Sequence, residues 1–268
     1  MLTADKTITI NDVLVRQYLL HKHNVNNIAL PPKRTKKLIG VTIHNTIDLP
    51  RVADDPEQYT RATVNGNMSS VRVHYYVDEL GAWQNLDTAY CNWTCTDGTG
   101  SGNMQTIAIE CIMDGTSGEN NLKARDNTAR LAAWLLYVNG LTADDLYTHT
   151  YWLHIRDGHK GTKRELMTRP HPYKTCPYYI IPDWDGFCSL VKTYFNALKG
   201  GFKSYKIRIK EDLNVRKDAG TNNPVVMVLH KNEVYTITAE KQVGTVKWGK
   251  LKSGVGWVSL LDKYSDKI

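Results

Sequence analysis

Histidine and cysteine gather between residues 148 and 177, in a pattern that suits metal chemistry. This stretch ends in Lys174-Thr-Cys176-Pro177. A cysteine thiolate forms at neutral pH beside a cation, a helix N-terminus or a metal, and Lys174 lies two positions before Cys176. A histidine followed downstream by a cysteine, with another histidine far upstream, suits a zinc site. A polar surface loop is the competing interpretation of the stretch taken alone. It holds four of the chain's nine histidines: His149, His154, His159 and His171.

A single carboxylate interrupts an apolar run that is predicted to be a strand. In Thr106–Ile112, alternation places Glu110 on one face with Ala108, while Ile109 takes the other face. Burying a charge without a partner costs on the order of several kcal/mol. Burial also raises the pKa of a carboxylate toward values that suit proton transfer. We therefore predict a functional role for Glu110, and a structural ion pair with a basic residue is the alternative.

The upstream histidine lies where a strand ends. Residues 38–44, Leu-Ile-Gly-Val-Thr-Ile-His, are apolar and β-branched, which predicts a buried strand with His44 at its end. A rigid strand end gives a metal site its precision. A histidine satisfied inside the core is the competing interpretation. A second strand over residues 71–77 carries His74, whose role stays open, and residues 82–86 are expected to form the return strand.

Helices and loops are expected between these strands. Asn11 is expected to cap a short helix that runs to Leu20. Further helices are predicted over residues 57–68, with its loop, 127–138, and from Asp183 or Asp185 to Leu198. Residues 91–103 are rich in Gly, Thr and Asn and are predicted to be a loop. Strands that alternate with helices make this part of the chain α/β.

Cysteine usage and apolar content limit the class of protein. Five cysteines are few and odd in number, which argues against a disulfide framework. Cys91 and Cys95 form a short bridge, a metal pair or neither. No apolar run approaches the length of a membrane span. The first residues lack a basic head followed by an apolar core, so we expect no signal peptide and synthesis in the cytoplasm.

The last quarter of the chain differs in pattern and in charge. Lys199-Gly-Gly201 is expected to end a helix and to serve as a linker between domains at residues 1–199 and 200–268. Short strands separated by turns follow over roughly 65 residues, which is typical of a small β-barrel. Residues 203–268 hold 13 Lys and Arg against 7 Asp and Glu, so they carry +6 of the chain's net charge of +7. Such a basic region favours an anionic partner: nucleic acid, teichoic acid or a charged surface.

Taken in chain order, these features resemble a known family. His44 at a strand end, the Ile-Ala-Ile-Glu110 strand, His149 and Lys174-Thr-Cys176-Pro177 are similar to the zinc-dependent N-acetylmuramoyl-L-alanine amidases of the phage endolysin and peptidoglycan recognition protein superfamily. The resemblance covers roughly residues 36–198. Residues 213–216 and 256–258 resemble parts of a bacterial SH3-like cell-wall-binding domain. The implied fold is α/β, with a mixed central sheet flanked by helices, followed by a small all-β SH3-like barrel.

The resemblance implies a role for each matching residue. His44, His149 and Cys176 match the three ligands of Zn²⁺, Glu110 matches the general base, and Lys174 matches a residue that supports the oxyanion. Two imidazoles and one thiolate leave a fourth zinc position open, as catalytic zinc sites do.

Some positions depart from the family's pattern. The segment between the second and third ligands is long and adds His171 as a rival ligand. Tyr90-Cys91 stands where the family has a tryptophan-histidine pair, and Val73 stands where some members have a tyrosine. These departures concern substrate contacts rather than the ligand types.

The implied activity is that of a peptidoglycan hydrolase that cleaves the amide bond between N-acetylmuramic acid and L-alanine. A phage or prophage endolysin without a signal peptide acts at the cell wall after release, and the basic domain would hold it on an anionic cell-wall polymer. Three alternatives remain: a non-catalytic peptidoglycan-binding protein, a bacterial autolysin with the same chemistry, and a nucleic-acid-binding protein. Lysines scattered among strands, without an aromatic stacking row, argue against nucleic acid.

Overall fold

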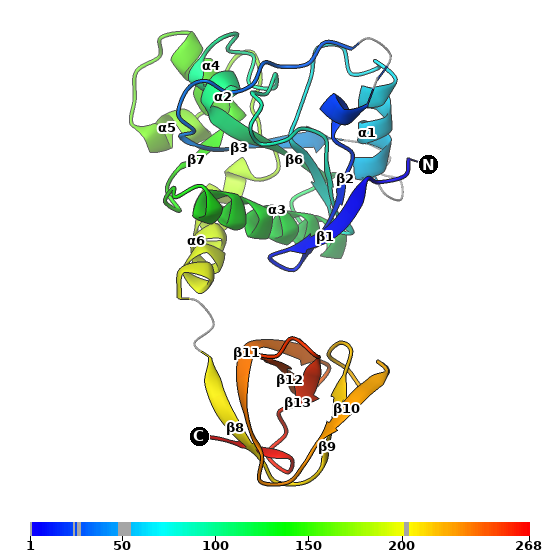
Figure 1. The fold of residues 1–268 in the computed structure, drawn as a ribbon. Coiled ribbons are helices and arrows are strands. Elements are labelled where there is room, and N and C mark those ends of the chain that lie inside the picture. The colour runs from blue at the N-terminus through cyan, green and yellow to red at the C-terminus, as the bar shows by residue number, and fades with distance from the viewer. Residues whose placement is uncertain (1, 24, 26–27, 48–54, 201–203) are drawn as a thin grey trace. The chain divides into compact units, whose positions relative to one another are not determined.

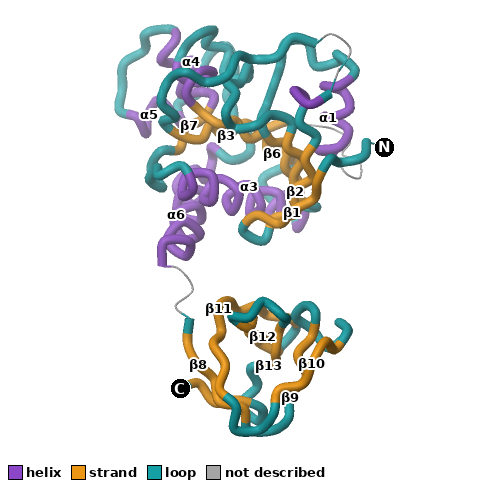
Figure 2. Tube along the Cα trace, in the orientation of Figure 1, coloured by secondary structure: helices purple, strands orange, loops and turns teal. Residues whose placement is uncertain are grey.

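The chain folds into two compact units, Met1–Lys199 and Gly200–Ile268. The structure is a computed structural model, and it describes residues 2–23, 25, 28–47, 55–200 and 204–268. Each unit has its own sheet and its own hydrophobic core. Figure 1 shows the first unit with helices around a sheet and the second unit built from strands, and Figure 2 colours the same elements by type.

A mixed sheet of seven strands forms the centre of the first unit, in the order β1-β2-β5-β4-β6-β3-β7. The neighbouring strands β4, β6, β3 and β7 are parallel, while β1 is antiparallel to β2 and β5 is antiparallel to β4. The predicted α/β fold with a mixed central sheet is therefore confirmed. The strands are β1 (Lys6–Ile10), β2 (Val13–Gln17), β3 (Gly40–Ile47), β4 (Tyr75–Asp78), β5 (Gly81–Gln84), β6 (Thr106–Met113) and β7 (Leu146–Thr148).

The helix expected from Asn11 to Leu20 is wrong, because this segment belongs to a β-hairpin. Asn11 and Asp12 form the turn between β1 and β2, with φ angles of 47° and 66°. Asn and Asp tolerate left-handed backbone better than other residues with side chains, which suits a two-residue hairpin turn. Val13 and Val15 are buried while Leu14 between them is exposed, so the apolar spacing is that of a strand.

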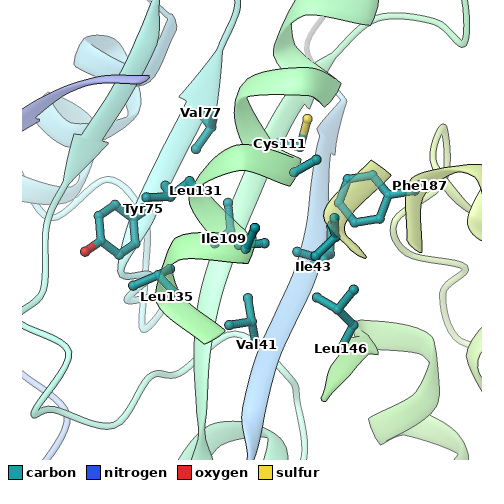
Figure 3. Packing of buried hydrophobic residues seen from close by; sticks show 14 of the residues in the cluster. Val41, Ile43, Tyr75, Val77, Ile109, Cys111, Leu131, Leu135, Leu146 and Phe187 are labelled. Carbon is teal, nitrogen blue, oxygen red and sulfur yellow. The ribbon is translucent and has the colours of Figure 1, made fainter. Parts of the chain in front are cut away.

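Two long helices cover one face of the sheet. The helix α3 (Glu119–Val138) begins eight residues before the position expected from the sequence, and α6 (Trp184–Gly200) begins at the expected position. Figure 3 shows Leu131 of α3 and Phe187 of α6 close to Ile43 and Ile109 of the central strands. The core of this unit lies between the sheet and these helices. The other helices are α1 (Asp55–Val64), α2 (Ser101–Gln105), α4 (His149–Arg156), α5 (Lys163–Thr168) and the short 3₁₀ turns Leu20–Lys22 and Ile181–Asp183.

The opposite face of the sheet has a smaller core and a polar part. Ala108 and Ile112 of β6 pack with Tyr76 of β4, and Tyr59 of α1 covers this cluster. Glu110 lies between Ala108 and Ile112 on β6, so its side chain belongs to this face, as the alternation predicts. Among the described residues, no helix has both the length and the apolar character needed to cross a membrane.

The second unit is a sheet of seven antiparallel strands in the order β10-β9-β13-β12-β11-β8-β14. Its small core includes Ile207, Val215, Ile237 and Val258. The six strands expected from the sequence are present, and the structure adds β14 near the end of the chain. The strands are β8 (Tyr205–Ile209), β9 (Leu213–Arg216), β10 (Val225–Leu229), β11 (Val234–Val243), β12 (Val246–Leu251), β13 (Trp257–Ser259) and β14 (Ser265–Lys267).

Candidate active site

Two of the predicted site residues face each other across neighbouring strands. The parallel register of β3 and β6 pairs His44 directly with Glu110. Both side chains lie on the face of the sheet away from α3 and α6, because Ile43 and Ile109 one position earlier point into the main core. The side chain of His44 is 1% exposed, that of Glu110 is 14% exposed, and Nδ1 of His44 lies 3.8 Å from Oε1 of Glu110.

The other two predicted ligands are held together by the first turn of α4. His149 is the first residue of this helix, and the hydroxyl of Thr148 caps it by accepting a hydrogen bond from the amide of Tyr151. Thr150 forms two hydrogen bonds with the backbone of Cys176, one as donor and one as acceptor. Its amide donates to the Cys176 carbonyl at 2.9 Å, and its hydroxyl accepts from the Cys176 amide at 2.7 Å. These bonds place Cys176 beside His149 although 27 positions separate them in the sequence.

Hydrogen bonds set the tautomer of His44. The hydroxyl of Thr94 donates its proton to Oδ1 of Asn92 at 2.6 Å, and Nε2 of His44 lies 3.1 Å from the same hydroxyl oxygen. A hydroxyl has one proton, so here it accepts from Nε2, which therefore carries the ring proton. Nδ1 keeps its lone pair and faces Glu110. Hydrogen bonding of the remote ring nitrogen is how metal-binding histidines are usually oriented.

One ring nitrogen of His149 is buried and forms no hydrogen bond. Its Nε2 lies 3.3 Å from the hydroxyl of Thr96, while its Nδ1 has no hydrogen-bond partner among the residues that the structure describes. The rings of His44 and His149 are 4.9 Å apart between centroids. Burial lowers the pKa of His149 to about 3, with the Lys174 charge adding to the effect, and burial followed by the charges of His149 and Lys174 lowers the pKa of His44. Both rings are therefore neutral near pH 7, the form that binds a metal.

His44, His149 and Cys176 lie close enough together to bind one cation. One ligand atom from each of His44, His149 and Cys176 lies within 4.8 Å of the others, and all three residues are buried. Burial raises the pKa of the Cys176 thiol to about 12, although the amide of Asn45 donates to its sulfur at 3.4 Å. A thiolate at neutral pH therefore needs a cation beside it. The two nitrogen lone pairs and the thiol fit a zinc ion, which favours nitrogen and sulfur ligands.

One carboxylate oxygen of Glu110 accepts a hydrogen bond from Thr46, and the other lies near His44. Oε2 accepts a hydrogen bond of 2.7 Å from the hydroxyl of Thr46, and Oε1 is the oxygen near His44. Burial raises the pKa of Glu110, and the Thr46 hydroxyl and the Lys174 charge oppose this. Glu110 does not sit in a purely structural ion pair with a lysine or arginine in the part of the chain that the structure describes. Its environment suits proton transfer.

Lys174 lies at the solvent-exposed edge of the site. Its side chain is exposed, and its positive charge is near enough to affect the pKa values of His44, His149, Glu110 and Cys176. It therefore contributes a positive potential to the place where the carboxylate and the metal ligands meet. The five residues that the sequence pattern singled out come together here from β3, β6, α4 and the loop before α6.

Two other histidines that the sequence left open lie away from these ligands. His171 is grouped with His154 and His159 rather than with His44 and His149. His74 uses both ring nitrogens inside the protein: Nε2 donates to the Tyr90 carbonyl at 3.1 Å, and Nδ1 accepts from the Ala108 amide at 3.1 Å. A histidine with both nitrogens bonded to backbone groups ties the sheet to the neighbouring loop.

Sequence reasoning missed the polar residues that orient the site. Thr94 and Thr96 come from the segment predicted only as a loop, and Thr46 follows the predicted strand end. The Gly-, Thr- and Asn-rich composition signals a loop but does not indicate which histidine each hydroxyl meets. Thr94 and Thr96 also line a groove of about 640 Å³ that includes Trp93 and Met104. The two threonines whose hydroxyls contact His44 and His149 are therefore also part of the wall of this groove.

Known proteins resemble this chain over the part that holds the candidate site. A family profile described as N-acetylmuramoyl-L-alanine amidase matches residues 34–178. The N-acetylmuramoyl-L-alanine amidase XlyA of Bacillus subtilis (strain 168) is 27% identical over 147 residues, which make up 55% of this chain and 42% of XlyA. The chain thus spans about two fifths of the length of this curated relative.

Solved structures share the fold of the first unit. A mutant endolysin from Bacillus subtilis is similar with a TM-score of 0.52 at 23% identity, covering 67% of this chain and 99% of the endolysin chain. The solution structure of the PlyG catalytic domain is similar with a TM-score of 0.51 at 25% identity, covering 68% of this chain and 94% of that domain. The range 34–178 that the family profile matches contains all five residues of the candidate site.

Proposed function

The chain belongs to the N-acetylmuramoyl-L-alanine amidase family, and from that premise we propose that it hydrolyses peptidoglycan at the amide bond between N-acetylmuramic acid and L-alanine. The observation that carries the proposal is the meeting of His44, His149 and Cys176 beside Glu110 at one face of the sheet. This is the residue set that hydrolysis of an unactivated amide needs: ligands for a Lewis acid and a neighbouring base.

We assign His44, His149 and Cys176 as the residues that hold zinc. A zinc ion bound there supplies a Lewis acid that lowers the pKa of water and polarises a carbonyl group. The protein's own contribution is orientation. Thr94 fixes the ring of His44, and Thr96 contacts the ring of His149, so the ligand nitrogens are positioned before the metal arrives.

The carboxylate of Glu110 is assigned as the general base. Its Oε2 is anchored by Thr46, which leaves Oε1 free to take a proton from the attacking water and pass it to the leaving amine of L-alanine. Lys174, at the exposed edge, is assigned to stabilise the negative charge that develops on the amide oxygen. The groove beside Thr94 and Thr96 suits an extended substrate, because it is open to solvent and has apolar walls at Trp93 and Met104.

The second unit is proposed to be an SH3-like domain that binds an anionic polymer of the cell wall. Its seven antiparallel strands around a small core support this, as does the charge of +6 carried by residues 203–268. A pocket of about 190 Å³ between Arg216, Trp248 and Tyr264 offers a cation and aromatic surface to a ligand. A second contact of this kind raises the local concentration of the enzyme on its substrate.

We propose that the whole protein acts as an endolysin. It would be made in the cytoplasm of the host, reach the wall after release, and cut the peptide stems from the glycan strands there. A bacterial autolysin would carry out the same chemistry. Family membership and the intact ligand set favour a hydrolase over a protein that only binds peptidoglycan.

Digestion of purified peptidoglycan, followed by mass analysis of the soluble fragments, tests the proposal. An amidase releases free peptides with an N-terminal L-alanine and leaves glycan strands with unsubstituted lactyl groups. Release of disaccharide-linked peptides would instead indicate cleavage within the glycan. Binding without any released fragment, by protein that contains zinc, would show that the chain is a binding protein and would refute the proposal.

A further inference from the structure

Three histidines outside the candidate active site form a second cluster. His154 lies in α4, His159 follows that helix, and His171 follows α5. One ligand atom from each lies within 4.8 Å of the others, as is also true of the first set. The ring centroids are 4.7 to 5.5 Å apart. Chemistry at the active site uses none of these side chains.

The ring of His154 is held so that a lone pair points into the cluster. Its Nε2 lies 3.0 Å from the carbonyl oxygen of Arg169, which only accepts hydrogen bonds, so Nε2 carries the proton. Nδ1 is then an acceptor, and it lies 2.7 Å from Nδ1 of His159. His159 is exposed, which gives solvent access to the pair. In a neutral cluster His159 donates a proton across this contact, and a cation between the rings replaces that proton.

The third histidine presents a buried nitrogen that lacks a hydrogen bond. His171 is buried, and its Nδ1 accepts from the amide of Tyr173 at 3.1 Å. Its Nε2 is buried and lies 3.1 Å from a carboxylate oxygen of Asp157, an ion-pair distance, but it makes no well-aligned hydrogen bond within the part of the chain that the structure describes. A buried polar atom that forms no hydrogen bond marks a place where a ligand is able to enter. The nearby carboxylate adds negative charge that favours a cation.

We propose that His154, His159 and His171 bind a second transition-metal ion, with zinc as the ion to test. Imidazole nitrogens are favoured ligands of zinc, nickel and copper, and three of them leave further positions for water. The site would be distinct from the active site, since it shares no ligand with His44, His149 and Cys176.

The arrangement also predicts how strongly each ligand contributes. Binding through Nε2 of His171 moves its ring proton to Nδ1 and costs the hydrogen bond from the Tyr173 amide. His154 keeps the bond from its Nε2–H to the Arg169 carbonyl, and it exchanges only the contact with His159 for the metal. Loss of His154 or His159 should therefore abolish binding, whereas loss of His171 should weaken it. This second ion should also bind more weakly than the ion at the buried active site.

A bound ion would fasten the segment between the two active-site ligands His149 and Cys176. The chain from His154 to His171 contains the short helix α5 and exposed loops, with few buried side chains apart from Leu166 and Met167. A metal ion bound to both His154 and His171 would link the two ends of this segment and hold its far end against α4. The ion would thus act on the part of the fold that supplies ligands to the active site, without taking part in its chemistry.

Zinc content of the full chain tests the proposal by a double-mutant design. Wild type, His159→Ala, Cys176→Ser and the double variant are loaded with zinc, dialysed, and analysed for metal per chain. We expect two ions, one, one and none. His230→Ala, which removes an exposed histidine from the second unit, is the matched control and should retain two ions. Because His159 is exposed, its replacement leaves the core intact, and circular dichroism checks this for each variant.

The outcomes separate this proposal from the proposed function. If His159→Ala holds as much zinc as wild type, the second site is refuted. If Cys176→Ser holds as much as wild type while His159→Ala loses an ion, the active-site assignment fails and the second site stands. As a second measurement, added zinc should raise the melting temperature of Cys176→Ser but not that of the double variant. Equal shifts in both would contradict a site at His159.

Discussion

Replacing Glu110 by glutamine removes a proton acceptor while keeping the shape of the side chain. The variant tests whether Glu110 acts as the base. Glutamine retains an oxygen that accepts the hydrogen bond from the Thr46 hydroxyl, which is 2.7 Å long in the native protein. The contact to His44 is 3.8 Å, and Glu110 is not one of the three proposed zinc ligands, so the zinc content should not change.

The expected effects on rate and on stability have different sizes. Loss of a general base typically lowers the rate by about 10² to 10⁴, which is about 3 to 5 kcal/mol of activation free energy. The hydrogen bond at stake contributes about 1 kcal/mol, and glutamine keeps it. Burial raises the pKa of Glu110, so the charged form is disfavoured where it lies, and removing the charge offsets any loss. The free energy of unfolding should therefore change by less than about 1 kcal/mol, or rise.

Thermal melts, zinc content and turnover on peptidoglycan, measured on one preparation, give the answer. The matched control is Glu57→Gln, another carboxylate in a buried residue, which accepts from the Leu2 amide at 2.7 Å and pairs with Arg61. This control should lose stability and keep its turnover per folded molecule. A Glu110→Gln protein that is folded, loaded with zinc and fully active would refute the mechanism, as would a variant that behaves like the control.

Three further predictions concern the ligands, the metal and the second unit. Thr94→Val removes the partner of His44 Nε2 and should weaken zinc binding by about 10- to 100-fold in competition with a chromophoric chelator, while Thr94→Ser should retain it. A chelator should lower the melting temperature of the wild type, because a ligand at 100 times its Kd adds about 2.7 kcal/mol, and the shift should be smaller in Cys176→Ser. A chain that ends at Gly200 should fold and keep the active-site zinc, but bind cell walls less tightly and with less dependence on salt, because it lacks the +6 region. Equal wall binding by the shortened and full-length chains would remove the role given to the second unit.

The sequence was sufficient for the strands that carry the site. Glu110 interrupts an apolar run. Successive side chains along a strand point to opposite faces, and this rule alone determines the face on which Glu110 lies. The histidine at residue 44 follows a β-branched run, so its position near a strand end was predictable, although β3 continues three residues further. Local patterns of this kind are reliable because one face of each strand is buried.

Other parts were not predictable because they depend on distant contacts or on backbone geometry. Asparagine caps helices and also forms left-handed turns, so Asn11 alone does not distinguish the start of a helix from the hairpin turn that it forms with Asp12. The hydroxyl of Thr94 meets a ring that is 50 positions away in the sequence. His171 was a rival ligand by order in the chain, and only its packing beside His154 removes it from the first set. Composition does not encode such pairings.

The pairing of β3 with β6 fixes how far apart His44 and Glu110 lie along the sheet. Eight consecutive residues of the two strands are in register, from Gly40 with Thr106 to Ile47 with Met113. Neighbouring strands are about 4.8 Å apart whatever side chains they carry, so the backbone ladder sets the distance between the Cα atoms of Glu110 and His44. Trp93, Thr94, Thr96, Gly98 and Thr99 line the groove and come from the loop before α2, outside this ladder. Substitutions in this loop can therefore alter the shape of the groove, while the spacing between the strands that carry His44 and Glu110 stays the same.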